Sequence, residues 1–170
     1  RNVFNLLGPL TNPANADLQL LGVYDRSKTE VLAKVLRELG TKRALVVSSH
    51  DGLDEISISA PTQISELNDG EIRTYDISPE DLGLKRYPLE DVIGGDANHN
   101  AQIIRQIFAG KRGAQRDIVL ANAAACFYIS GLASTLQEGV KAAEEIIDSG
   151  QAAKKLEDFV HFTKELSHVS

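Results

Sequence analysis

The sequence of 170 residues contains no Met, no Trp and a single Cys, and aromatic side chains make up only 5% of it. One cysteine cannot form an intrachain disulfide, so a disulfide framework is excluded and a reducing, intracellular setting is the default. With so few aromatic residues, the core must be built mainly from Leu, Ile, Val and Ala. Because Met is absent, we expect that the intact protein continues upstream of Arg1.

The chain also lacks a long apolar run and an excess of basic residues. No apolar stretch reaches the roughly 18 residues of a spanning helix, and the N-terminus has no signal-peptide layout. We therefore expect a soluble, cytoplasmic protein with no membrane partner. The 18 Lys and Arg residues against 24 Asp and Glu residues give a net charge of −6, which disfavours binding to the phosphates of a nucleic acid. The length fits a single domain over residues 1–170.

The order of the first apolar segments predicts an α/β fold. We expect a buried strand over 18–24 and a second strand over 43–49. The helix between them is expected to begin with Ser27 as the N-cap of a capping box and to end at Gly40. A strand, helix, strand unit of this length is typical of a right-handed parallel crossover. The sequence thus predicts a mostly parallel sheet flanked by helices.

The rest of the chain is expected to add short strands and then helices. The alternating segment 56–59 predicts a half-exposed strand, and residues 62–76 predict a hairpin with its turn at 68–70. Helices are expected over residues 97–108, 117–132, 136–149 and 152–166. The second of these helices is apolar nearly all round, so we expect it to be buried against the sheet.

Acidic residues after the second expected strand are the main candidates for chemistry. Asp54 and Glu55 lie just beyond its carboxyl end, where open α/β sheets place ligand sites, and Asp51 precedes them. Hard oxygen ligands of this kind suit Mg²⁺, whose coordination is usually completed by water and substrate phosphates. An adjacent acidic pair is also common on solvated surfaces. The residue pattern alone therefore leaves both a metal role and a surface role open.

Other polar residues give weaker signals. His50 can serve as a proton donor or phosphate contact, or can pack against its turn. Asn122 falls in the most apolar helix, where a buried amide needs hydrogen-bond partners. Cys126 in the same helix is expected to be a packing residue, because burial raises the pKa of a thiol and blocks access to it. No histidine pair has zinc-ligand spacing with Cys126, and no glycine-rich phosphate loop or Walker sequence is present.

Four segments together resemble landmarks of the anthranilate phosphoribosyltransferase family, in the same order along the chain. The segments are RNVFNLLGPLTNPA (1–14), QLLGVY (19–24), DGLDEIS (51–57) and NAAA (122–125). The resemblance covers essentially the whole chain and is strongest before residue 60. It implies that the chain is the major part of the C-terminal phosphoribosyltransferase domain of that family.

The resemblance implies an activity and a set of site residues. The family transfers the 5-phosphoribosyl group from phosphoribosyl pyrophosphate to the amino nitrogen of anthranilate, with release of pyrophosphate, in tryptophan biosynthesis. By position, Asp54 and Glu55 match an acidic pair that binds a Mg²⁺ associated with the pyrophosphate, where divalent charge offsets the charge on the leaving group. Gly8 and Pro9 match a turn that lines the anthranilate passage, with capping of a first helix as the structural alternative.

The resemblance also implies that part of the active site lies elsewhere. The family's helical domain, glycine-rich pyrophosphate loop and anthranilate-binding Arg fall upstream of residue 1, so that role is not given to Arg1. We expect the chain by itself to be catalytically inactive and the full-length protein to be a homodimer. A pyrimidine nucleoside phosphorylase and a noncatalytic nucleic-acid-binding relative of the same fold are the alternatives, and the intact acidic pair argues against the second.

Overall fold

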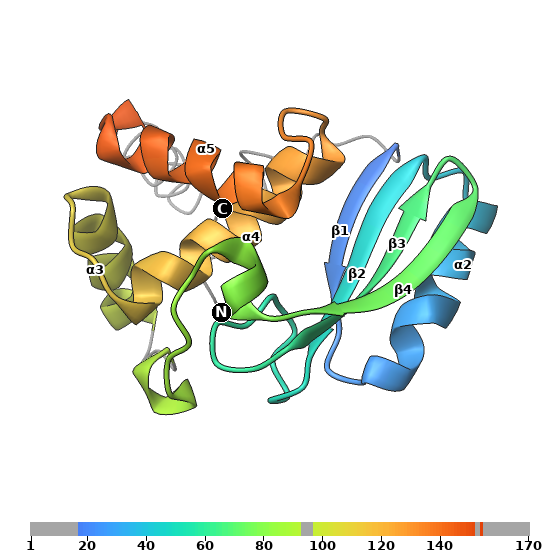
Figure 1. The fold of residues 1–170 in the computed structure, drawn as a ribbon, viewed down its shortest axis with the longest axis horizontal. Helices are drawn as coiled ribbons and strands as arrows, with labels where there is room; N and C mark the ends of the chain where they lie inside the picture. The colour runs from blue at the N-terminus through green and yellow to red at the C-terminus, as the bar shows by residue number, and fades with distance from the viewer. Residues whose placement is uncertain (1–16, 93–96, 152–153, 155–170) are drawn as a thin grey trace, which may run out of the picture.

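The structure is a computed structural model that describes residues 17–92, 97–151 and 154. Gly8 and Pro9 lie outside the described residues, as does nearly all of the helix expected over 152–166. Within the described part, a four-stranded sheet carries helices on its faces, which confirms the α/β class (Figure 1). None of the described helices has both the length and the apolar character needed to cross a bilayer.

The sheet follows chain order. Its strands are β1 (Leu18–Gly22), β2 (Arg43–Ser49), β3 (Thr62–Asn68) and β4 (Glu71–Ile77). β1 and β2 are parallel, whereas β2 with β3 and β3 with β4 are antiparallel. The prediction of a mostly parallel sheet is therefore wrong for the described residues. Parallel neighbours need a crossover that returns the chain to the other end of the sheet, and only the β1 to β2 connection contains one.

The crossover helix α2 (Thr29–Glu38) follows a short 3₁₀ turn, η1 (Arg26–Lys28). The start of this region differs from the prediction, because Asp25 is the cap: its carboxylate accepts hydrogen bonds from the backbone N of Ser27 at 3.0 Å and from its hydroxyl at 2.7 Å. Ser27 is thus a donor to the cap and not the cap itself. The predicted end of the helix is confirmed, since Gly40 adopts φ 91° just beyond it.

The hairpin prediction is confirmed, and the strand expected before it is wrong. Asp69 and Gly70 form the turn between β3 and β4, both with positive φ. Ile56 and Ile58 lie in the loop between β2 and β3 and are fully buried, at 1% and 0% exposure. No neighbouring strand pairs with this segment in the described part of the chain. Its alternating pattern instead reflects two isoleucines that point into the core.

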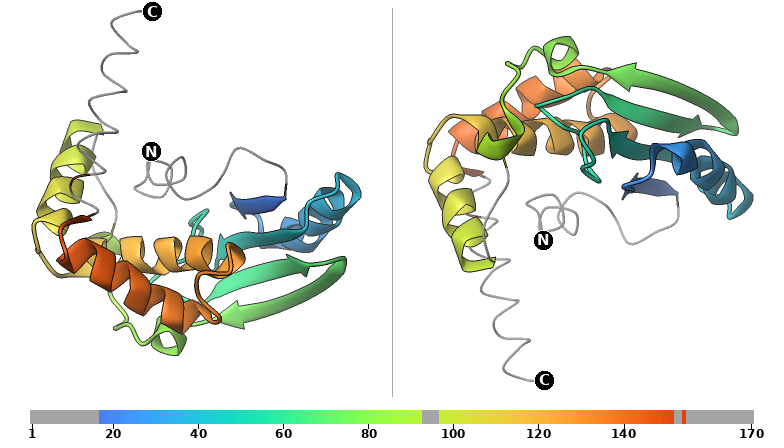
Figure 2. Two further views of the ribbon diagram at one scale, coloured as in Figure 1. Left: turned by 90° about the horizontal axis from the view of Figure 1, so that it is seen from above. Right: turned by 90° about the horizontal axis from the view of Figure 1, so that it is seen from below.

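The core forms around α4 (Ala114–Ile129), in which twelve of sixteen residues are buried. This confirms the prediction of a central buried helix, although it begins three residues earlier than expected. α5 (Leu136–Asp148) lies against α4, and α3 (Ala97–Phe108) precedes it (Figures 1 and 2). A Cβ on Gly139 of α5 would lie 2.7 Å from the carbonyl oxygen of Ala124, so the small residue permits this close packing.

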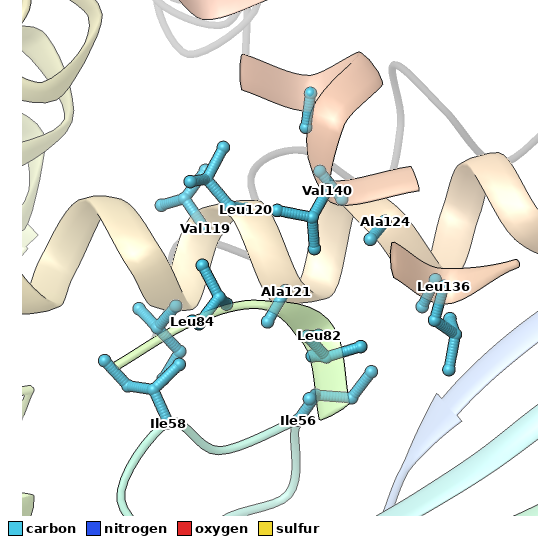
Figure 3. Packing of buried hydrophobic residues seen from close by; sticks show 14 of the residues in the cluster. Ile56, Ile58, Leu82, Leu84, Val119, Leu120, Ala121, Ala124, Leu136 and Val140 are labelled. Carbon is cyan, nitrogen blue, oxygen red and sulfur yellow. The ribbon is translucent and has the colours of Figure 1, made fainter. Parts of the chain in front are cut away.

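Two 3₁₀ turns, η2 (Pro79–Leu82) and η3 (Leu89–Asp91), lie in the connection between β4 and α3. Figure 3 shows how the β2 to β3 loop and η2 pack against α4 and α5. The labelled members of this cluster are Ile56, Ile58, Leu82, Leu84, Val119, Leu120, Ala121, Ala124, Leu136 and Val140. The loop that carries the acidic residues is therefore anchored in the core by buried side chains and does not project freely into solvent.

Candidate functional site

The acidic pair lies in the loop of residues 50–61, which folds back on the carboxyl end of β2. The backbone N of Ser49 donates a hydrogen bond to the carbonyl of Leu53, and the N of His50 donates to the carbonyl of Pro61, both at 2.9 Å. These bonds close the loop at its base. Because β1 is parallel to β2, the end of β1 meets the same edge of the sheet, which is where ligand sites of α/β sheets form.

Asp51 holds the loop together from inside. One carboxylate oxygen accepts hydrogen bonds from the Ser49 hydroxyl and from the backbone N of Leu53, and the other accepts from the Ser57 hydroxyl at 2.7 Å. Both oxygens are thus engaged within the loop. The described residues contain no group of three His, Cys, Asp or Glu side chains that could hold a metal ion. The site offers two acidic residues and not a complete protein cage.

Gly22, at the end of β1, allows the loop to come close to the sheet. A Cβ at this position would lie 1.7 Å from the carbonyl oxygen of Asp54, far inside van der Waals contact. Only glycine leaves room for this approach. The backbone of Asp54 therefore packs directly against β1 at Gly22. The sequence carried a weak signal for this contact, a lone glycine inside a strand pattern, which indicates close approach of another backbone.

Glu55 is the more deeply buried member of the pair, with 8% of its surface exposed. Burial, followed by the charges of Asp54 and Asp51, raises the pKa of the Glu55 carboxyl from 4.5 to about 7. No Lys or Arg among the described residues forms an ion pair with it. A buried carboxylate with acidic neighbours is costly to ionise unless a cation joins it.

These features fit a divalent cation with oxygen ligands. Mg²⁺ usually binds through one or two carboxylates and keeps several waters or phosphate oxygens, so a pair of carboxylates at a sheet edge suits it. Asp54 and Glu55 are the residues that would hold the ion. The structure places both predicted residues at the sheet edge, with Glu55 buried, and adds Gly22 as a residue that supports their loop; that they bind a metal stays a prediction.

A second buried carboxylate, on β3, shows what a fully partnered acid looks like in this fold. Glu66 accepts hydrogen bonds from the hydroxyls of Tyr75 at 2.7 Å and Tyr128 at 2.6 Å, and pairs with Arg73 at 3.3 Å. Burial, with the hydrogen bond to Glu66, raises the pKa of both tyrosines above the ordinary value. Among the described residues, Glu55 has no comparable set of donors, which distinguishes a structural carboxylate from a candidate ligand.

Asn122 connects α4 to the acidic loop. Its Oδ1 accepts from the backbone N of Ile56, and its Nδ2 donates to the carbonyl oxygens of Ile56 and Ile118, each at 2.9 Å. The prediction that this residue needs partners is confirmed, since it is 3% exposed. Sequence reasoning could not identify Ile56 as the partner, because 66 positions separate the two residues.

His50 joins two elements at the same end of the sheet. Arg26 Nη1 lies 2.7 Å from His50 Nδ1, and His50 Nε2 lies 3.1 Å from an Asp76 oxygen. Because arginine can only donate, Nδ1 accepts and Nε2–H donates to Asp76. Both ring nitrogens are engaged, which favours the interpretation that His50 packs its turn. Cys126 is buried at 3% exposure, as expected of a packing residue.

Comparison with known proteins places these features in context. Residues 1–153 match the family model described as glycosyl transferase family, a/b domain. The chain is 54% identical to an anthranilate phosphoribosyltransferase of Symbiobacterium thermophilum over 166 residues, which are 98% of this chain and 49% of that protein. It is 49% identical to one of Methanobrevibacter smithii over 163 residues, 96% of this chain and 49% of the relative.

Solved structures show the same similarity. An anthranilate phosphoribosyltransferase from Thermus thermophilus superposes with a TM-score of 0.79 at 41% identity, covering 96% of this chain and 48% of that one. A Saccharomyces cerevisiae enzyme of the same name, in complex with PRPP and Mg, gives 0.76 at 29% identity, covering 95% and 47%. The chain thus spans about half the length of the relatives it matches.

Proposed function

Since the chain belongs to the glycosyl transferase family, whose a/b domain spans residues 1–153 here, we propose that it is part of an anthranilate phosphoribosyltransferase. The whole enzyme would transfer the 5-phosphoribosyl group from phosphoribosyl pyrophosphate to anthranilate, releasing pyrophosphate, in tryptophan biosynthesis. Support comes from relatives of that name that are 49% and 54% identical to this chain. The similar yeast structure in complex with PRPP and Mg supports it too.

The observation that carries the proposal is the acidic pair at the end of β1 and β2, in which Glu55 is buried and Asp54 is half-buried. Asp54 and Glu55 would hold Mg²⁺, and their carboxylates act as ligands and not as general bases. The bound ion would offset the negative charge that develops on the departing pyrophosphate. In this chain, Gly22 and the 50–61 loop support the two acidic residues at the sheet edge.

The anthranilate site is proposed to include Gly8 and Pro9. Both belong to the segment that most resembles the family, and the match to the family model begins at residue 1. A small residue followed by a rigid one would shape an entry for a flat aromatic ring. Replacing Gly8 with Val in the full-length enzyme is expected to raise the KM for anthranilate and to leave the KM for phosphoribosyl pyrophosphate unchanged.

We further propose that the chain is active only when the remaining half of the enzyme is supplied, and that the full-length protein is a cytoplasmic homodimer. The matched relatives are about twice as long as the chain, so half of each relative has no counterpart here. Light scattering on the full-length protein tests the dimer. Measurable phosphoribosyl transfer by the 170-residue chain alone would refute the first proposal.

The metal role is tested by Asp54→Asn with Glu55→Gln in the full-length protein. The double variant is expected to need much more Mg²⁺ for half-maximal transfer, because both ligands lose their charge. A matched variant, Asp69→Asn with Glu71→Gln on the exposed β3 to β4 hairpin, removes the same charge and is expected to behave as the parent. An unchanged magnesium titration in the first variant would remove the pair from the site. Phosphorolysis of a nucleoside, with no use of anthranilate, would favour a pyrimidine nucleoside phosphorylase.

A further inference from the structure

We infer that Asn122 is a positioning residue for the acidic pair: its amide fixes the backbone at Ile56 and thereby sets where the neighbouring carboxylates of Asp54 and Glu55 stand. The inference rests on the proposed role of these carboxylates as cation ligands. It concerns a residue on a different element from the pair, separated from the loop by 66 positions in the sequence.

Hydrogen bonds from the Asn122 side chain engage both backbone polar groups of Ile56. Asn122 accepts from its N–H and donates to its carbonyl, both at 2.9 Å, as a neighbouring β-strand would. The third bond, to the carbonyl of Ile118 one turn earlier in α4, fixes the orientation of the amide. With 3% of Asn122 exposed, little water can compete for these partners, so the amide holds one arrangement.

The acidic pair lies between two such fixed points. On one side, the carbonyl of Asp54 is seated on Gly22, where even a Cβ would collide at 1.7 Å. On the other side, Ile56 is held by Asn122 and by its own side chain, which is 1% exposed in the core beside α4 (Figure 3). Residues 54 and 55 therefore span a short interval between two anchors. Partners that hold ligand-bearing groups in this way contribute to metal affinity without touching the ion.

A structural role and a positioning role predict different results. If Asn122 only stabilises the core, its loss lowers stability and affects cation binding no more than any other core defect. If it positions the pair, cation binding falls further than in a control of similar stability. Val140→Ala is such a control, because Val140 is buried on α5 against α4 and its side chain makes no hydrogen bond.

The experiment uses Mn²⁺ as the probe on the full-length protein, labelled with ¹⁵N. Broadening of the amide signals of residues 53–57 reports where the ion binds and with what affinity. The hydrogen-exchange rate of the Ile56 amide reports whether its hydrogen bond to Asn122 is intact. Asn122→Ala is expected to weaken Mn²⁺ binding about tenfold or more and to speed exchange at Ile56. Val140→Ala is expected to stay within about twofold of the parent. If Asn122→Ala does not fold, Asn122→Ser, which keeps a small hydroxyl, provides the same comparison.

The outcomes separate the two hypotheses. If the parent binds Mn²⁺ at Asp54 and Glu55, and Asn122→Ala and Val140→Ala weaken this binding equally, the positioning role is overturned. The proposed cation role then stays intact. A parent chain that shows no broadening at the pair up to millimolar Mn²⁺ overturns the cation role, and the positioning role with it. Selective weakening in the Asn122 variants supports both.

Discussion

Replacing Glu55 with Gln is expected to stabilise the folded chain at neutral pH, although it removes a proposed cation ligand. Burial and the charges of Asp54 and Asp51 raise the Glu55 pKa from 4.5 to about 7, so the fold favours the neutral form of this carboxyl. The associated stability is complete below about pH 4.5. It is lost as the pH rises through about 7, because ionisation in the folded state is then opposed by burial and by the two acids.

The size of the effect follows from the shift. Raising the Glu55 pKa from 4.5 to about 7 lowers the free energy of unfolding of the parent by about 3 kcal/mol between the acidic limit and pH 8. Gln has the shape of a protonated Glu and cannot ionise, so the variant does not lose this contribution. The free energy of unfolding of Glu55→Gln should therefore match that of the parent near pH 4 and exceed it by up to about 3 kcal/mol near pH 8.

Urea unfolding of the parent and Glu55→Gln, at steps between about pH 4 and pH 8 and constant ionic strength, measures this difference. Glu71→Gln on the exposed hairpin is the control and is expected to show no comparable pH-dependent difference from the parent. Adding MgCl₂ near pH 8 is expected to raise the stability of the parent more than that of Glu55→Gln, because binding to the folded state stabilises it. The reasoning would be refuted if Glu55→Gln were less stable than the parent at pH 8. It would also be refuted if the two free energies of unfolding differed by the same amount at every pH.

Three further changes test one support of the site and two packing contacts of the fold. Gly22→Ala is expected to lower the free energy of unfolding by about 1–3 kcal/mol, since its Cβ forces the Asp54 carbonyl to move; urea unfolding checks this against Gln19→Ala, which should be nearly neutral. Gly139→Ala is expected to loosen the contact of α5 with α4 and to lower the thermal midpoint, whereas an unchanged midpoint would show that the helices shift without cost. Glu66→Gln is expected to lower the pKa of its two tyrosine partners, because the carboxylate that holds their protons is gone; the ultraviolet titration of tyrosinate should move to lower pH.

The elements that sequence reasoning predicted correctly are those defined by neighbours along the chain. The end of α2 at Gly40, the hairpin turn at Asp69 and the apolar character of α4 each depend on residues a few positions apart. The cap at Asp25 was missed because Asp25 and Ser27, two positions apart, both qualify as caps. The local pattern alone did not identify which of them would accept the hydrogen bonds.

The wrong predictions concern contacts between distant segments. β3 is antiparallel to β2 because the 50–61 loop returns the chain without a crossover helix, and no periodicity reveals this return. The alternation around Ile56 is real, but its backbone partners come from a side chain of α4 and not from a strand. Likewise, the position of the acidic pair after β2 and its family resemblance identify the pair, whereas the partners of Gly22 and Asn122 are defined only once the chain is folded.

The bond between Asn122 and Ile56 also sets an order of events during synthesis. At about 5–20 residues per second, residue 122 is added some 3–13 s after residue 56. Until α4 has been made and has docked, the backbone of Ile56 lacks its partners and the neighbouring carboxylates lack their second anchor. An ordered acidic pair is thus expected late in folding, so the cation binding proposed for it would report that the chain has assembled as far as its central helix.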